Sequence, residues 1–180
     1  MINVKGGNGM RRVIIMIIVL IINIVLQSTI INDISINNVS PNLLVITTVS
    51  FALLRGKYEG GIIGFLCGLL QDIFFGKVLG FYALIYMYIG FFSGYLYRSF
   101  YKESILIPTL VISGCDFIYG LYVYIFSFLF RGKLNFVYYL GNIIMPELVY
   151  TTLVAVIVYK LFHLINNKLE SREKKEANSN

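Results

Sequence analysis

The chain has little of what most enzymes and metalloproteins depend on. Histidine occurs once, cysteine twice and tryptophan not at all in 180 residues, and charged residues make up 13%, against about 25% in soluble domains. One histidine and two scattered cysteines cannot supply the four ligands of a structural zinc site. No nucleophile–base pair is readable either. We therefore expect no catalytic site, no metal and no cofactor.

Apolar side chains are what the chain has in abundance. Hydrophobic residues reach 58% and the mean hydropathy is +0.78. A protein this small has too little interior to hide so much apolar surface from water. The bilayer is the solvent that fits, so we expect an all-α, polytopic membrane helical bundle. Cys67 and Cys115 both fall inside apolar segments, where buried free thiols are expected.

Six hydrophobic segments are predicted to be spans, although the second, at about 14 residues, is too short to cross comfortably unless the bilayer thins or the preceding segment enters the membrane. Short links force antiparallel neighbours and a compact bundle. Residues 1–165 then form the transmembrane helical domain, and residues 166–180 form a charged cytoplasmic tail. The six predicted spans are Val13–Ile31, Pro41–Leu54, Gly60–Phe75, Val78–Tyr97, Ile105–Phe130 and Phe136–Phe162.

Prolines mark two positions in this scheme. Ser40 followed by Pro41 predicts an N-cap with proline at the first helical position of the second span. Pro146 lies inside the sixth span and is expected to kink it. The link between the second and third spans is expected at Arg55–Glu59.

The net charge of +6 is distributed as a topology signal rather than as a nucleic-acid-binding patch. If the N-terminus is inside, the basic residues on the outer side are Lys77, Arg131 and Lys133, and the other 12 of the 15 lie inside. The positive-inside rule then places both termini in the cytoplasm.

Glycine recurs at four-residue spacing through the third span and into the fourth. Small residues at this spacing let another helix backbone approach closely. One interpretation is packing between the third and fourth spans, which we favour. The other is a docking groove for a helix of another protein. Under either interpretation, Gly68→Leu should disturb the helix contact much more than Gly68→Ala. The glycines concerned are Gly60, Gly64, Gly68, Gly76, Gly80, Gly90 and Gly94.

Three acids, Asp72, Asp116 and Glu147, lie within predicted spans. Such residues cost roughly 2.5–3.5 kcal/mol at a helix centre on insertion scales, which makes each a functional candidate. Asp116 and Glu147 fall near the midplane with no basic residue at that depth. They form either a polar clasp between helices or a site for a proton or substrate, and both readings stay open. Nearby hydrogen-bond donors in the sequence are Ser113, Tyr119, Asn142 and Tyr150.

The run from Gly64 to Leu84 resembles the signature region of the rod shape-determining protein MreD family. In that family a G-x-x-x-G-L-L-x-D stretch precedes a glycine turn, an L-G pair and a short aromatic-alanine-leucine run. The basic N-terminus, six apolar segments and a late proline followed by tyrosine and threonine are also similar. The residues transferred as a structural signature are Gly64, Gly68, Asp72, Gly76 and Gly80.

The resemblance implies a bacterial inner-membrane scaffold of the cell-wall elongation machinery, without enzymatic activity. Its implied partners are the bitopic protein MreC, the glycan polymerase and penicillin-binding protein of the elongation complex, and the filament protein MreB. MreD proteins also resemble the substrate-binding membrane subunits of vitamin transporters, which have six helices. A small-molecule transporter subunit is therefore the alternative function.

Overall fold

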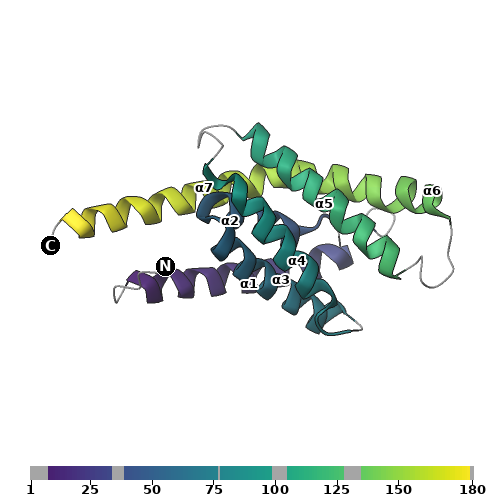
Figure 1. The fold of residues 1–180 in the computed structure, drawn as a ribbon, viewed down its shortest axis with the longest axis horizontal. Helices are drawn as coiled ribbons and strands as arrows, with labels where there is room; N and C mark the ends of the chain where they lie inside the picture. The colour runs from purple at the N-terminus through teal and green to yellow at the C-terminus, as the bar shows by residue number, and fades with distance from the viewer. Residues whose placement is uncertain (1–7, 34–38, 77, 99–104, 128–134, 179–180) are drawn as a thin grey trace.

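The computed structural model describes residues 8–33, 39–76, 78–98, 105–127 and 135–178, and the regular structure in these ranges is helical (Figure 1). The all-α class is thus confirmed. In chain order the elements are α1 (Asn8–Asp33), α2 (Leu43–Arg55), α3 (Lys57–Phe75), α4 (Phe81–Ser93), the 3-10 helix η1 (Gly94–Arg98), α5 (Leu106–Ser127), α6 (Phe136–Tyr139), the π-helix η3 (Leu140–Ile144) and α7 (Met145–Asn178).

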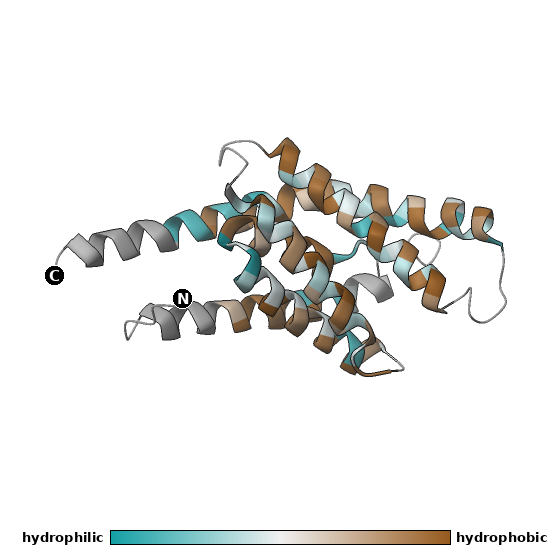
Figure 2. Ribbon diagram, viewed as in Figure 1, coloured by the Kyte–Doolittle hydropathy of each residue, from teal (hydrophilic) through white to brown (hydrophobic). Residues whose placement is uncertain are grey.

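The described helices divide into long and short apolar segments. Lys57–Phe75, Leu106–Phe126 and Phe136–Lys168 are long and apolar enough to cross a membrane. Met16–Thr29, Leu43–Arg55 and Phe81–Tyr97 are apolar but shorter. Each of the six predicted spans overlaps one of these segments, and Figure 2 shows apolar residues along all of them. That all six cross the bilayer stays a prediction.

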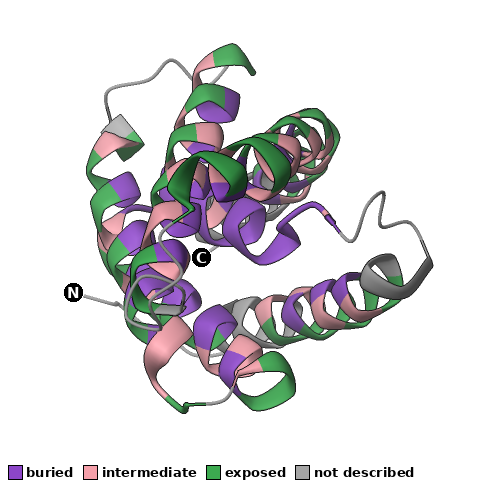
Figure 3. Cartoon of the chain, turned by 90° about the vertical axis from the view of Figure 1, so that its right-hand side faces the viewer, coloured by how far each residue is buried: buried purple, intermediate pink, exposed green. Residues whose placement is uncertain are grey.

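Helix α2 is the central element of the bundle. Its 13 residues rise about 20 Å, and all except Phe51 and Arg55 are buried, which Figure 3 shows as purple at the centre. It packs against α1, α3, α4, α5 and α7. Neighbouring helices therefore cover nearly the whole surface of α2, including the side chains of Thr47, Thr48 and Ser50.

The start of α2 differs from the prediction. Asn42, not Ser40, is the N-cap, and its Oδ1 accepts a hydrogen bond of 3.1 Å from the Val45 N–H. The amide oxygen satisfies one of the N–H groups that have no partner at a helix start. The predicted link Arg55–Glu59 is also wrong, because Gly56 alone separates α2 from α3. Its φ of 96° is a conformation that glycine adopts without steric cost.

Pro146 is accommodated by a change of helix type. The preceding residues, Leu140–Ile144, form the π-helix η3, and the Met145 N–H donates to the Leu140 carbonyl, five residues back. A proline removes one N–H donor and crowds the carbonyl four residues before it. A wider turn just upstream lets the helix continue through Pro146 into α7.

The peripheral helices are less enclosed. Among the described helices α1 packs mainly against α2, and α1 leaves apolar side chains such as Ile21 and Val25 exposed. Helices α5 and α7 pack together through a hydrogen bond of 2.7 Å between the Ser113 and Thr152 hydroxyls. The N-terminal end of α1 and the C-terminal end of α7 extend from the same side of the bundle (Figure 1).

Candidate functional site

The glycines of α3 lie in the contact between α3 and α4, the most extensive helix pair of the described structure. A Cβ added at Gly64 would overlap the Tyr86 carbonyl, and one at Gly68 would overlap the Tyr82 carbonyl and the Ala83 backbone. The backbones of the two helices are therefore in direct contact. A side chain at either position would separate them.

The same contact continues toward the other end of the helix pair. A Cβ at Gly60 would meet Ala52 of α2 and the Gly90 carbonyl, and one at Gly90 would overlap the Gly60 carbonyl. Gly94, the first residue of η1, lies against the backbone of Lys57. These glycines thus face other helices of this chain.

Gly76 and Gly80 belong to the turn between α3 and α4 rather than to the helix contact. Gly76 ends α3, and its N–H donates to the Asp72 carbonyl over 3.0 Å. Gly80 has a φ of 95° and no atom within 4 Å of an added Cβ, so conformation rather than space requires glycine there. The four-residue spacing in the sequence therefore combines two roles, close helix packing and turn geometry.

Asp72 joins the end of α3 to the start of α4. Its Oδ2 accepts from the Gly80 N–H at 2.9 Å and the Ala83 N–H at 3.1 Å, and its Oδ1 accepts from the Tyr82 N–H at 2.9 Å. The side chain is 3% exposed. N–H groups at a helix start have no partner within the helix and carry partial positive charge, so a carboxylate is well placed there.

A second polar group lies where the segment before α2 enters the bundle. Asn42 Oδ1 accepts from the Tyr86 hydroxyl at 2.9 Å, and the Asn42 N–H donates to Thr151 Oγ1 at 3.1 Å. Gln27 of α1 donates to the Pro41 carbonyl at 3.2 Å and accepts from the Leu43 N–H at 2.9 Å. We call Gln27, Asn42, Tyr86 and Thr151 the polar centre.

The polar centre is reinforced one turn further along α1 and α2. Thr47 donates to Asn23 Oδ1 at 2.9 Å, and both side chains are buried. Helices α1, α2, α4 and α7 are therefore connected by hydrogen bonds in the interior. In an apolar surrounding these bonds fix the register of the helices, because leaving a polar group without a partner is costly.

Asp116 and Glu147 lie next to the polar centre. The Thr151 side chain, which accepts from the Asn42 N–H, is also close enough to Asp116 to interact with its carboxyl. The Glu147 carboxyl is close enough to Asp116 for electrostatic interaction. Asp116 is 3% exposed, and its Oδ1 has no hydrogen-bond partner within the described ranges. The structure thus brings these two acids together and places Asp72 at a separate site.

The donors that the sequence offered for these acids are mostly engaged elsewhere. Ser113 bonds with Thr109 and Thr152, and Asn142 donates to the Tyr138 carbonyl. Sequence reasoning missed Asn42 and Tyr86. The asparagine after Ser40-Pro41 was a readable helix-cap signal, whereas Tyr86 gave no signal because tyrosine is common in this chain.

The cysteines are both free, as expected. Cys67 is fully buried, but Cys115 is only partly buried, with its sulfur 3.3 Å from the Ser93 hydroxyl. The difference follows from their positions, because Cys67 is on the face of α3 that packs inward and Cys115 is on a peripheral helix.

Comparison with known proteins gives one match. The family model of the rod shape-determining protein MreD covers residues 10–169. No curated protein and no solved structure matches the chain. The matched range contains the α3–α4 turn, the polar centre and the Asp116–Glu147 pair. The chain therefore belongs to the MreD family of bacterial inner-membrane proteins, which act in rod-shape determination.

Proposed function

We propose that this chain is a non-enzymatic scaffold of the cell-wall elongation machinery, which binds MreC and links it to cytoskeletal and peptidoglycan-synthesis partners. The observation that carries the proposal is the family match over residues 10–169. The glycan polymerase, the penicillin-binding protein and MreB are the further partners that the proposal names.

The distribution of contacts supports a scaffold with its docking surfaces on the outside. Gly60, Gly64, Gly68 and Gly90 already pack against other parts of this chain, so we assign them to internal helix packing. Exposed apolar side chains instead line the outer faces of α5 and α7, where Leu110 and Leu153 are examples. These faces are available to lipid and to helices of other membrane proteins.

We further propose that six helices cross the membrane with both termini in the cytoplasm. The six apolar segments and the positive-inside charge distribution support this topology. So does the position of the two ends of the described chain on one side of the bundle (Figure 1). Single cysteines at Asn37 and Lys133 should label from outside in intact cells, and one at Lys102 only after permeabilisation. Labelling of Lys102 in intact cells would contradict this topology.

The test of the function is co-purification. A tagged full-length chain is isolated from bacterial membranes in mild detergent, beside an unrelated polytopic protein with the same tag. We expect MreC with the tagged chain and not with the control. A transport ATPase module in place of MreC would support the alternative, a substrate-binding transporter subunit, and would overturn the scaffold.

A further inference from the structure

The Asp116–Glu147 pair lies deep in the membrane region. Asp116 is in the middle of α5, about 15 Å from either end. Glu147 lies about 16 Å along the continuous helical run that starts at Phe136. Asp116 is buried, whereas Glu147 is partly buried. The pair therefore has one enclosed and one more accessible carboxyl.

Charge balance is the unusual feature of the pair. The two carboxyls interact with each other, with the Thr151 side chain and with neutral tyrosine and cysteine side chains, and within the described ranges neither acid has a basic partner. Two neighbouring carboxylates in an apolar surrounding repel each other and cannot both stay ionised without compensation. Asp116 Oδ1 also has no hydrogen-bond partner among the described residues.

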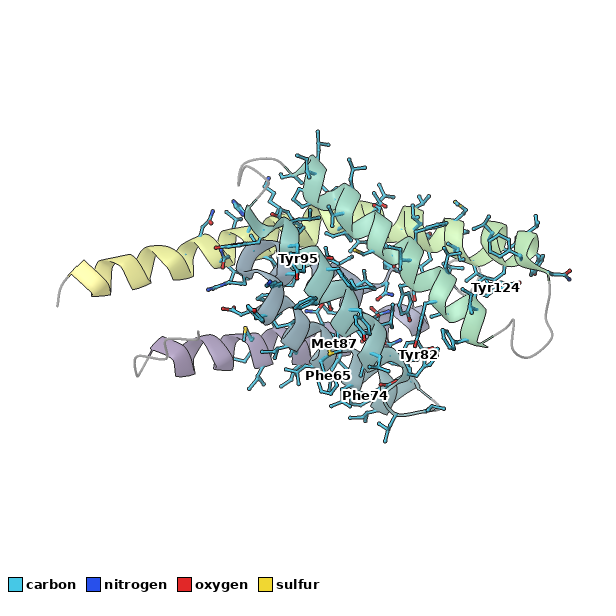
Figure 4. All side chains as sticks on the ribbon, viewed as in Figure 1. Phe65, Phe74, Tyr82, Met87, Tyr95 and Tyr124 are labelled. Atoms are coloured by element: carbon cyan, nitrogen blue, oxygen red, sulfur yellow. The ribbon has the colours of Figure 1, made fainter. Side chains whose placement is uncertain are left out.

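The groups that surround the pair are neutral hydroxyls. Tyr86 already donates its hydroxyl to Asn42, and Asp72 of α3 is occupied by three backbone N–H groups. The ring of Tyr82, on α4, packs near α5, with its centroid 6.1 Å from that of Tyr119 (Figure 4). The titratable groups facing Glu147 from the packed elements are Tyr82 and Tyr86 of α4, Tyr119 of α5 and Tyr139 of α6.

We propose that Asp116 and Glu147 bind one small monovalent cation, a proton or a sodium ion, and that this cation lets α5 and α7 pack together at the polar centre. Oxygen ligands suit small hard cations, and the pair with the Thr151 hydroxyl offers oxygens alone. A single positive charge between two carboxyls fits this arrangement.

The direct test is labelling with a membrane-soluble carbodiimide, which reacts with a protonated carboxyl. The full-length wild-type protein in bilayer vesicles is treated over a range of pH in potassium buffer, with and without sodium, and adducts are located by peptide mass spectrometry. We expect an adduct on Glu147 that is lost in Glu147→Gln. Asp72 is the internal control and should stay unmodified, because it is buried and both of its oxygens are engaged by backbone N–H groups.

The two cations give different responses. Loss of the adduct at alkaline pH, unaffected by sodium, identifies the proton. Protection by sodium at constant pH identifies the sodium ion. Absence of an adduct on both acids at every pH, or an adduct that neither pH nor sodium changes, would overturn the proposal. Because this experiment uses wild-type protein, it does not depend on a variant that folds.

A second measurement tests the link to packing. The melting temperature of the purified protein in detergent is compared with that of the double variant Asp116→Asn, Glu147→Gln. The wild type should lose stability at alkaline pH or gain it with sodium, while the double variant should respond to neither, because it has no charge to compensate. Equal responses of the two proteins would contradict the proposed role of the cation.

Discussion

Asp72 of α3 and Asp116 of α5 are the same amino acid and are equally buried, at 3% exposure. Asp72 accepts three backbone N–H bonds at the start of α4. Asp116 interacts with the Thr151 side chain, has an oxygen without a partner among the described residues and interacts with a second acid, Glu147. Backbone N–H groups compensate the negative charge of Asp72, whereas no basic group of the described residues compensates a negative charge on Asp116.

The difference shows that the cost of an acid in a membrane helix depends on which groups are close to it. At the end of α3 the chain turns, and the N–H groups of the next helix are free to bond a carboxylate. In the middle of α5 the backbone is fully hydrogen-bonded, so compensation must come from side chains or from a bound cation. We therefore expect Asp72 to be structural and the Asp116–Glu147 pair to respond to pH or ions.

The largest effect is expected for replacement of Gly68, which lies in the same contact between α3 and α4 that Asp72 joins. Leucine at Gly68 should abolish accumulation of the protein, because α3 and α4 are in backbone contact there. The structure also revises the expected tolerance of alanine, since a Cβ alone overlaps the Tyr82 carbonyl. Gly68→Ala should cost about 1–3 kcal/mol. Membrane abundance and melting temperature measure both effects.

Gly114→Ala is the matched control for Gly68. Gly114 lies on the exposed side of α5 with no atom within 4 Å of an added Cβ, so the variant should accumulate and melt like the wild type. Equal tolerance of alanine at Gly68 and Gly114 would show that the α3–α4 contact is looser than described here.

The next largest effect is expected for Asp72→Asn. An amide keeps one acceptor oxygen, but its NH₂ group would face an N–H donor of α4. At least one buried donor would lose its partner, at about 1–3 kcal/mol. The melting temperature should fall clearly, and amide hydrogen exchange at Gly80, Tyr82 and Ala83 should become faster. If Asp72→Asn exchanged and melted like the wild type, the three bonds would not be what stabilises the turn.

A smaller loss of stability is expected for Gly80→Ala, which tests how much the conformation of the α3–α4 turn contributes. At a φ of 95° an L-residue is strained by about 1–2 kcal/mol although the space is open. Gly141→Ala, at another glycine with open space but no positive φ, is the control. The difference between the two melting temperatures isolates the cost of the backbone conformation.

The smallest effect is expected for the amide variants of the acidic pair. Asp116→Asn and Glu147→Gln keep hydrogen-bonding groups of similar shape and remove the charge that needs compensation. In a strain lacking the native copy both should support normal rod shape. Asp116→Leu should do worse, because the Thr151 hydroxyl would lose a partner at about 1–3 kcal/mol. Cell width is measured together with membrane abundance. Round cells at wild-type abundance would show that the charge has a function beyond a clasp.

Much of the helical layout was predictable because it follows from local patterns. The six apolar segments, the short second one among them, come from hydrophobic composition and spacing along the chain. The cap of α2 was displaced by two residues, and the single-residue link at Gly56 and the π-helix before Pro146 were not foreseen. These features depend on how a helix end or a proline is fitted against its neighbours, so sequence patterns define them poorly.

By itself the sequence determined that the chain is a helical membrane protein and that acids and glycines lie at unusual positions. The tertiary structure alone decided which of those residues act together. Asn42 and Thr151 are 109 positions apart yet form a hydrogen bond, and Asp116 meets Glu147 across two helices. The reason is physical: apolar periodicity is a local property that solvent selects, whereas the partner of a buried polar group is set by which helices pack side by side.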